Sequence, residues 1–406
     1  MQSVYSLADY FPHGPAPGEQ KKIDIVAVAK STVVPAKRSR TSEEESSEAG
    51  DESIKKLGEK EEDVEFGLVF NIHNYLWGRK DLLSTIRTEK KEKVPDEGSV
   101  WWEGSVLDEG SVSDEGSVSD EGSVSDEGPV PVTFFDLRHL PFWRPEYQAS
   151  GKNIQFATHF MIRDEYKKLD EFVAEHKDSH ILVIGQPGIG KTVYLTYCLL
   201  CRLTEKKRTV LMFDPNRCYL FQDEGVYKLP LDLYERTDNH VIIQQADKTL
   251  FLYDCNESQA TVKRTRPGVQ MLITTYPKQS RYAGFEKQLS PSRFIMRTWT
   301  WPEIYLSRHM AKQWRSTAKL VEAYGMYGGS ARILFKKEES EVKQELDQAI
   351  HNCKTLDSLF SEETMSTPTS SLIVQVNPAF ENDEIRRSLL TVSFISARIL
   401  ERLCNK

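Results

Sequence analysis

The order of apolar and polar positions predicts an α/β core that begins near residue 132. Five short apolar runs have the length and branched side chains of strands buried in a parallel sheet. Helical patterns separate several of them, which is typical of a mostly parallel sheet flanked by helices. The runs lie at residues 181–184, 208–214, 248–254, 269–275 and around Phe294.

Helices and one hairpin are predicted between and after these strands. Apolar residues have helical spacing in residues 163–176, and a second helix is predicted over residues 191–204. Residues 217–229 predict a β-hairpin with Asp223, Glu224 and Gly225 at its turn. The core therefore spans residues 132–300. Beyond it we expect a helical C-terminal subdomain, residues 301–406, with helices at about 303–325, 330–353 and 381–404.

The first 131 residues have a different composition, and we expect a disordered acidic tail there. Residues 1–62 mix Pro, Ser, Lys and Glu without a sustained apolar period. Residues 96–130 form a hexapeptide repeat of the type DEGSVS, which favours a solvated linker over a parallel β-helix because it offers almost no core. Between them, an apolar segment at 66–77 and a helical candidate at 81–88 either pack on the main domain or bind a partner.

Charge is distributed unevenly along the 406 residues, whose net charge is −8. Residues 1–133 carry 28 acidic and 15 basic side chains, whereas the remainder carries 33 acidic and 38 basic ones. The acidic tail could bind a protein partner. Residues 263–297 contain eight Lys or Arg and one acid, Glu286. This basic patch could contact nucleic acid, supply an arginine such as Arg281 to a phosphate, or be a solvated surface.

The sequence predicts an intracellular protein without a membrane span. No apolar run approaches the about 18 residues that a transmembrane helix needs, and the N-terminus lacks the features of a signal peptide. A short basic cluster at 35–40 is a weak nuclear-import signal, so either the cytoplasm or the nucleus is expected. Cys198 and Cys201 form a C-x-x-C within a predicted helix, where we interpret them as small buried residues rather than a redox or metal pair.

The most informative stretch follows the first strand. The eight residues Gly185, Gln186, Pro187, Gly188, Ile189, Gly190, Lys191 and Thr192 fit the phosphate-loop pattern G-x-x-x-x-G-K-[ST]. Glycines let backbone N–H groups converge on a polyphosphate, and the start of the next helix adds further N–H groups, so we assign residues 185 to Val193 to nucleotide binding. Lys191 is expected on the β- and γ-phosphates, and the Thr192 hydroxyl on Mg²⁺.

Polar residues at the ends of later elements complete the predicted site. Asp254 ends an apolar strand and is expected to be a Mg²⁺ ligand, the alternative being a cap of the next turn. Glu257 is the candidate that orients or deprotonates the attacking water. Thr275 could sense the γ-phosphate, and Arg332 could reach the nucleotide from the first turn of a helix. Each of these two could equally be an ordinary strand or surface residue.

Blocks in a fixed order carry a resemblance to a known family. They read ILVIGQPGIGKT, CYLFQDEGV, LFLYDCNE, LITTYPK, TWTWPEIY and YGGSARILF. Over about residues 134–400 the chain resembles the NTPase module of Crinkler (CRN) effectors and of the related retrotransposon hot spot (RHS) proteins of oomycetes, fungi and some protists. The resemblance implies a P-loop NTPase fold with an additional strand between the loop strand and the Asp254 strand. It also implies that Thr275 approximates a sensor and Arg332 a second one.

The combined interpretation is an ATP-binding protein. We expect a slow Mg²⁺-dependent ATPase whose hydrolysis cycle moves the C-terminal segment against the core. The alternative is a degenerate nucleotide-binding adaptor or nucleic-acid-binding regulator without turnover. Family members often carry an LFLAK-type translocation motif and a toxin domain, and we expect neither in this chain. Only the resemblance indicates secretion into a host.

Overall fold

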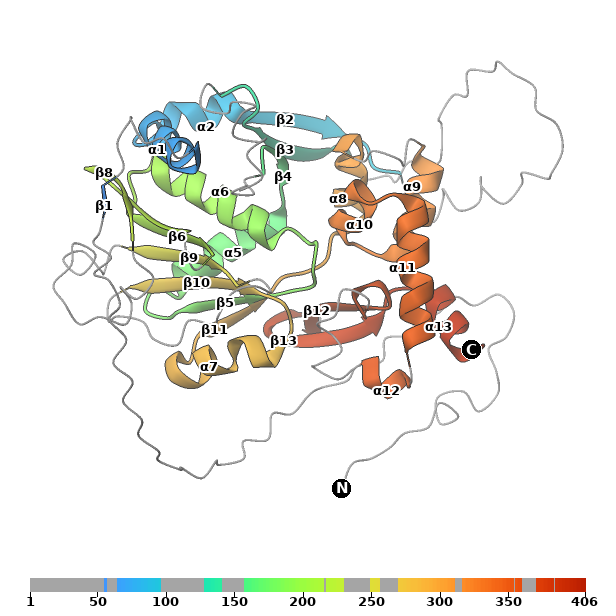
Figure 1. Cartoon of the computed structure of the whole chain (residues 1–406). Coiled ribbons are helices and arrows are strands. Elements are labelled where there is room, and N and C mark those ends of the chain that lie inside the picture. The colour runs from blue at the N-terminus through green and yellow to red at the C-terminus, as the bar shows by residue number, and fades with distance from the viewer. Residues whose placement is uncertain are drawn as a thin grey trace, which may run out of the picture.

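The structure is a computed structural model in which a central sheet with packed helices lies beside a C-terminal group of helices and a hairpin (Figure 1). It describes residues 55–56, 64–95, 128–140, 157–214, 217–229, 249–255, 269–310, 316–353, 355–359, 370–382 and 384–406. The central sheet has eight strands in the order β1-β8-β7-β6-β9-β10-β5-β11.

Five of these strands are mutually parallel and form the middle and one edge of the sheet. They match the five apolar runs of the sequence, so the α/β architecture with a mostly parallel sheet is confirmed. Their bounds are β5 (Ile181–Ile184), β6 (Thr209–Asp214), β9 (Leu250–Asp254), β10 (Gln270–Thr275) and β11 (Ser292–Ile295).

The other edge of the sheet is antiparallel. Strands β7 (Arg217–Gln222) and β8 (Gly225–Lys228) form the expected hairpin with its turn at Asp223 and Glu224. The short strand β1 (Lys55–Lys56) pairs with β8.

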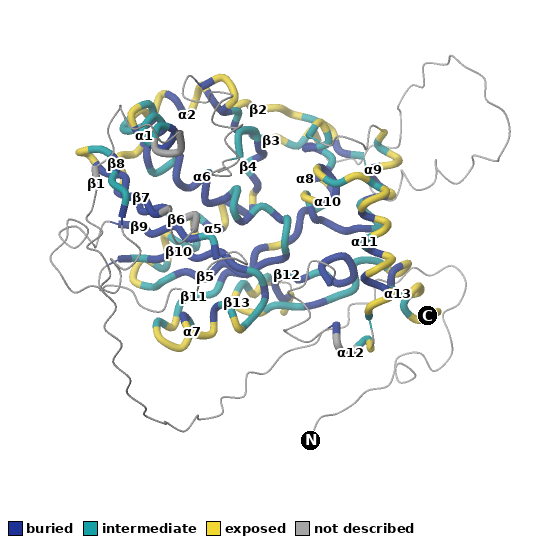
Figure 2. Tube along the Cα trace, viewed as in Figure 1, coloured by how far each residue is buried: buried dark blue, intermediate teal, exposed yellow. Residues whose placement is uncertain are grey.

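Successive residues of the central strands enter opposite faces of the sheet, as the pleat requires. Ile181 and Val183 of β5 pack with helices α5 (Asp164–Glu175) and α6 (Lys191–Thr204), both close to their expected positions. On the other face, Leu182 and Ile184 belong to a cluster with helix α7 (Gln279–Leu289). The dark blue strands of Figure 2 show this double burial.

Residues 64–95 differ from the disordered tail that we expected. They form α1 (Val64–Leu76), α2 (Lys80–Ile86) and β2 (Arg87–Glu92). The apolar stripe of α1 explains the difference, because Leu68, Val69, Ile72 and Leu76 are buried in the same core as α6. The segment therefore packs on the main domain. The basic cluster at 35–40 and residues 96–127 of the repeat lie outside the described residues.

A small antiparallel sheet joins this N-terminal part to the core. Strand β3 (Val130–Asp136) pairs with β2 on one side and with β4 (His159–Ile162) on the other. Because β2 precedes the repeat and β3 follows it, the two ends of the repeat lie side by side in the fold.

The C-terminal part starts with short helices. The expected helix at 303–325 is divided into α8 (Trp301–Leu306), a 3₁₀ helix (Arg308–Met310) and α9 (Thr317–Tyr327). Pro302 occupies the first turn of α8, as expected, and Thr300 and Glu303 form a capping box there. The expected helix at 330–353 is divided into α10 (Ala331–Lys336) and α11 (Glu339–Asn352), followed by α12 (Leu356–Leu359).

The expected helix at 381–404 is wrong for most of its length. Residues Val374–Glu381 and Glu384–Phe394 form an antiparallel hairpin, β12 and β13, and only Ala397–Cys404 is helical (α13). Val376 of β12 lies opposite Val392 of β13, and both side chains are buried. Pairing of branched residues across the two strands overrides the local helical spacing of residues 385–389. The C-terminal subdomain is therefore not purely helical.

Candidate functional site

The order of the strands gathers the predicted site residues at one edge of the sheet. Strand β10 lies between β5 and β9, and all three run parallel. One strand thus separates the strand before the glycine-rich loop from the strand that ends at Asp254. The register pairs Thr275 with Ile184 and Thr274 with Asp254. The glycine-rich loop after Ile184 therefore starts beside the ends of β9 and β10.

The loop has the backbone conformation of an anion-binding nest. Gly188 and Gly190 have φ values of 82° and 100°, and Gly190 is the N-cap of α6. Left-handed glycines alternating with other conformations turn successive N–H groups toward one concavity. Among the described residues, the amides of Gly188, Gly190 and Lys191 have no hydrogen-bond acceptor. Val193 lies in the first turn of α6, whose N–H groups add to the positive end of the helix.

Asp254 faces the loop, as the sequence predicted. Its Oδ2 accepts a hydrogen bond from the Thr192 hydroxyl at 2.7 Å, and its Oδ1 accepts one from the Thr274 hydroxyl at 2.7 Å. A hydroxyl and a carboxylate at this separation, beside the glycine-rich loop, are oxygen ligands of the kind that Mg²⁺ binds. Such sites typically use one or two protein oxygens together with substrate phosphates and water.

Lys191 is folded back onto its own loop. Its Nζ donates hydrogen bonds to the carbonyl oxygens of Gly185 (2.6 Å) and Gln186 (2.8 Å), and it lies 5.0 Å from the ring centre of Tyr276. Burial lowers the pKa of Lys191 to about 7; the Asp254 carboxylate opposes this shift and the Arg332 guanidinium adds to it. An anion that entered the loop would favour the charged form of Lys191.

Thr275 and Arg332 also lie at this edge. The Thr275 side chain is buried, and its hydroxyl oxygen is without a hydrogen-bond partner of good geometry within the described residues. It does lie near enough to the Cys255 thiol to act on the pKa of that group. Arg332 is exposed at the start of α10, and its backbone N–H donates to the Gly188 carbonyl at 3.2 Å. Glu257 lies outside the described residues, so its role stays a prediction.

Two loop side chains point away from the nest. The Gln186 amide nitrogen donates to the Ser371 carbonyl at 2.8 Å, and its oxygen accepts from the Val376 N–H at 3.2 Å. Ile189 is fully buried in the core. Both residues therefore offer a ligand only their backbone, and Gln186 connects the loop to the hairpin β12–β13.

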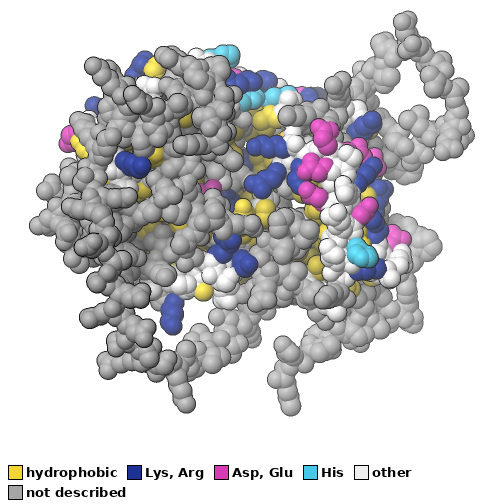
Figure 3. Space-filling model, in the orientation of Figure 1, with side chains coloured by type: hydrophobic (Ala, Val, Ile, Leu, Met, Phe, Trp, Pro, Cys, Tyr) yellow, Lys and Arg dark blue, Asp and Glu magenta, His cyan; other side chains and the backbone are white. Residues whose placement is uncertain are grey.

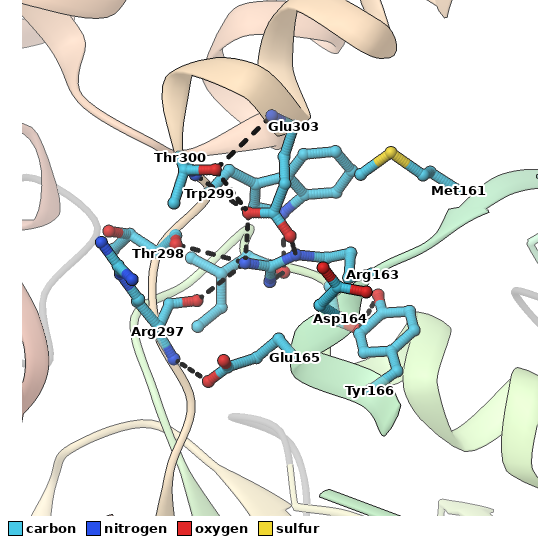
Figure 4. A network of polar contacts seen from close by, with 12 residues as sticks. Met161, Arg163, Asp164, Glu165, Tyr166, Arg297, Thr298, Trp299, Thr300 and Glu303 are labelled. Carbon is cyan, nitrogen blue, oxygen red and sulfur yellow. Dashed lines mark hydrogen bonds and ion pairs between the residues drawn. The ribbon is translucent and has the colours of Figure 1, made fainter. Parts of the chain in front are cut away.

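The sequence analysis missed a buried arginine behind the loop. Arg163 is 1% exposed, and its Nη1 donates to the Ile189 carbonyl at 2.9 Å (Figure 4). Its Nε and Nη2 form a bidentate pair with Glu303 at 2.9 and 3.0 Å. The sequence around Arg163 gives only a weak indication of this buried role, because an arginine just before an amphipathic helix is common as an ordinary exposed residue.

The structure describes only some of the basic residues of the patch at 263–297. Lys263, Arg264 and Arg266 lie outside the described residues. Arg293 forms an ion pair with Glu286, and the Arg281 charge acts on Cys255. Figure 3 shows Lys and Arg side chains near the middle of the face that is in view, between the sheet and the C-terminal helices.

Other chemistry finds little support in the described residues. Cys198 and Cys201 are free thiols whose pKa values are raised to about 12 by burial, as expected for structural residues. Within the same ranges there is no group of three or more His, Cys, Asp or Glu side chains arranged to hold a metal ion. No described helix combines the length and the apolar content needed to cross a bilayer.

Comparison with known proteins adds no assignment: no protein-family model matches the chain, and no curated protein matches it either.

Proposed function

We propose that the chain is a P-loop NTPase that binds ATP, with Mg²⁺, in the loop formed by residues 185–192. The observation that carries the proposal is the 2.7 Å hydrogen bond between the Thr192 hydroxyl and Asp254, beside a nest made by Gly188 and Gly190. Two residues that are 62 positions apart in the sequence meet where a phosphate-bound cation needs its ligands.

Each residue has a role that follows from its position. The N–H groups of residues 188–192 bind phosphate oxygens, and Lys191 turns from the Gly185 and Gln186 carbonyls toward the β- and γ-phosphates. The buried Thr275 hydroxyl donates to the terminal phosphate. Arg332 stands at the rim, where its charge stabilises the far end of the triphosphate.

Thr192 and Asp254 would hold Mg²⁺, which would supply charge neutralisation between the phosphates. Hydrolysis then depends mainly on positioning and electrostatic stabilisation, and we propose Glu257 as the residue that orients the water. Because Arg332 and Gln186 connect the loop to α10 and to the hairpin, release of the terminal phosphate would alter the C-terminal part.

The test is binding of MgATP to the full chain, measured by titration calorimetry for the wild type and for Lys191→Ala. Lys177→Ala serves as the control, because this exposed lysine lies in the turn between α5 and the start of β5, whereas the nest follows the other end of β5. We expect Lys191→Ala to lose about tenfold or more in affinity, since a charge-assisted contact contributes about 1.5–3 kcal/mol. Equal affinity in all three proteins would refute the proposal.

A regulator that binds nucleotide without turnover remains the second candidate. It uses the same binding site and the same Asp254 contacts as the enzyme, and it differs only in the water-orienting role proposed for Glu257. Glu257→Gln separates the two. Loss of phosphate release with retained binding supports the enzyme, whereas an unchanged background rate supports the adaptor.

A further inference from the structure

The six carbonyl groups of residues 185–190 all have donors supplied by the protein. Lys191 binds the first two, those of Gly185 and Gln186. The remaining four are bound from outside the loop. The Ser330 hydroxyl donates to Pro187 (3.4 Å), the Arg332 amide to Gly188 (3.2 Å), Arg163 and the Trp299 indole to Ile189 (2.9 Å each), and the Tyr166 hydroxyl to Gly190 (2.9 Å).

This arrangement fixes where the amides point. In a planar trans peptide, the C=O of one residue and the N–H of the next point in opposite directions. A donor that holds the Ile189 carbonyl on the outer side therefore turns the Gly190 N–H inward. The Tyr166 hydroxyl, together with the Tyr194 N–H of α6, which donates to the Gly190 carbonyl at 2.9 Å, does the same for the Lys191 N–H. The outer donors thus set the shape of the inner nest.

Three of these donors form one buried cluster (Figure 4). The Arg163 guanidinium lies 4.9 Å from the ring centre of Trp299 and 5.9 Å from that of Tyr166. Its Nη2 also donates to the carbonyls of Arg297 and Thr298, at 3.1 and 3.2 Å. Burial of this charge is costly unless it is paired and hydrogen-bonded, and Glu303 satisfies that need.

We propose that Arg163, Tyr166 and Trp299 are positioning residues that hold the phosphate nest in its binding shape. The inference rests on the proposed nucleotide function and extends it, because none of the three side chains bears on the nucleotide directly. They act through the carbonyls of Ile189 and Gly190.

Removal of single donor atoms tests the proposal. Tyr166→Phe deletes the hydroxyl on Gly190, and Trp299→Phe deletes the indole N–H on Ile189. Arg163→Lys keeps the charge beside Glu303 but lacks the fork needed to reach the Ile189 carbonyl as well.

The chain offers a matched control for each change. Tyr194 is an equally buried tyrosine whose hydroxyl binds Asp170, and Trp301 is a buried tryptophan whose indole binds the Pro95 carbonyl. Arg387 forms a comparable pair with Glu165. Tyr194→Phe, Trp301→Phe and Arg387→Lys therefore remove similar bonds that do not touch the loop.

All six variants and the wild type are titrated with MgATP and with magnesium tripolyphosphate, and their melting temperatures are measured. We expect each loop-facing change to weaken both ligands about two- to tenfold, the range for one lost hydrogen bond. The controls should lose stability to a similar extent and keep wild-type affinity. Tripolyphosphate isolates the phosphate contacts from those of the base.

Three results would overturn the inference in distinguishable ways. If the wild type binds MgATP with dependence on Lys191 but the loop-facing variants bind as well as their controls, the positioning role fails and the proposed function stands. If the wild type shows no such binding, both fail. A weakening shared equally by loop-facing and control variants also counts against the positioning role, because it reports only lost stability.

Discussion

Two buried arginine–glutamate pairs join the first turn of α5 to the C-terminal part, and they differ in what else they touch. Arg163 pairs with Glu303 of α8 and also binds the phosphate loop. Arg387 of β13 pairs with Glu165 and binds the Ile295 carbonyl at the end of β11. The side chains of Arg163 and Glu303 are 1% and 17% exposed, and those of Arg387 and Glu165 are 14% and 5% exposed. The arginine is therefore the more buried member of the first pair, and the glutamate is the more buried member of the second.

The difference teaches that burial of an ion pair says little about its purpose. Both arginines also pack on aromatic rings, Trp299 and Phe294 respectively. A buried pair is weak evidence for net stability, because desolvation offsets much of the attraction. The carbonyls that each guanidinium binds distinguish them. Arg163 binds a loop carbonyl, that of Ile189, besides those of Arg297 and Thr298, whereas Arg387 binds the Ile295 carbonyl at the sheet edge.

The largest effect is expected when Glu303 is removed. Glu303→Leu leaves the Arg163 charge unpaired in the core and also breaks the capping box of α8, so we expect a loss of about 3–5 kcal/mol of unfolding free energy. Urea denaturation monitored by tryptophan fluorescence measures it. The double variant Arg163→Met with Glu303→Leu should regain much of that loss. No recovery would mean that the lost charge pairing is not the main cause.

A smaller loss of unfolding free energy, without an effect on nucleotide binding, is expected at the second pair. Arg387→Met removes the partner of Glu165, but the Glu165 Oε1 still accepts a hydrogen bond from the Arg297 N–H at 2.6 Å. We expect a loss of roughly 1–3 kcal/mol, the cost of an under-satisfied buried group, with unchanged affinity for MgATP. Weakened nucleotide binding at preserved stability would erase the contrast between the two pairs.

The smallest effect concerns a ring contact between β4 and the 3₁₀ helix of the C-terminal part. His159 of β4 and His309 lie 5.4 Å apart between ring centres. Burial lowers the pKa of both; Lys90 adds to the shift at His309 and Arg138 to that at His159. The unfolded chain therefore binds more protons as the pH falls through 6.5, and stability decreases there.

His309→Gln should flatten this pH dependence. We expect a change of less than about 1 kcal/mol between pH 7.5 and pH 5.5, because partial exposure screens both rings. Urea midpoints at the two pH values measure it for the wild type and the variant. A wild-type protein that is more stable at the lower pH would contradict the sign.

The sequence was informative where the cause of structure is local. The strand before Gly185, the helix after Gly190 and the carboxylate at Asp254 each follow from a pattern within a few residues, and the sheet order then brings them together. The contact of Thr274 with Asp254 was not predicted, because it depends on the pairing of β9 with β10.

Features that depend on contacts between residues far apart in the sequence were not predicted. Arg163 acquires its role only because Glu303, 140 positions away, and the Ile189 carbonyl meet its guanidinium. Residues 384–394 contain enough helix-favouring Glu, Arg and Leu to predict a helix, and only β12 makes them a strand. The same holds for α1. Its apolar stripe indicates burial, but the sequence alone does not show that α6 is the helix it packs against.

The pairing of β2 with β3 has a practical consequence for the acidic repeat between them. Six residue pairs, from Arg87 with Phe135 to Glu92 with Val130, join the chain on both sides of it, and α1 and α2 are anchored in the core. A protease site inserted between residues 96 and 127 should therefore yield two fragments that co-elute on gel filtration until denaturant is added. A recombinant product that begins at residue 132 would instead leave the β3 edge and the apolar side of α6 bare, and it should aggregate.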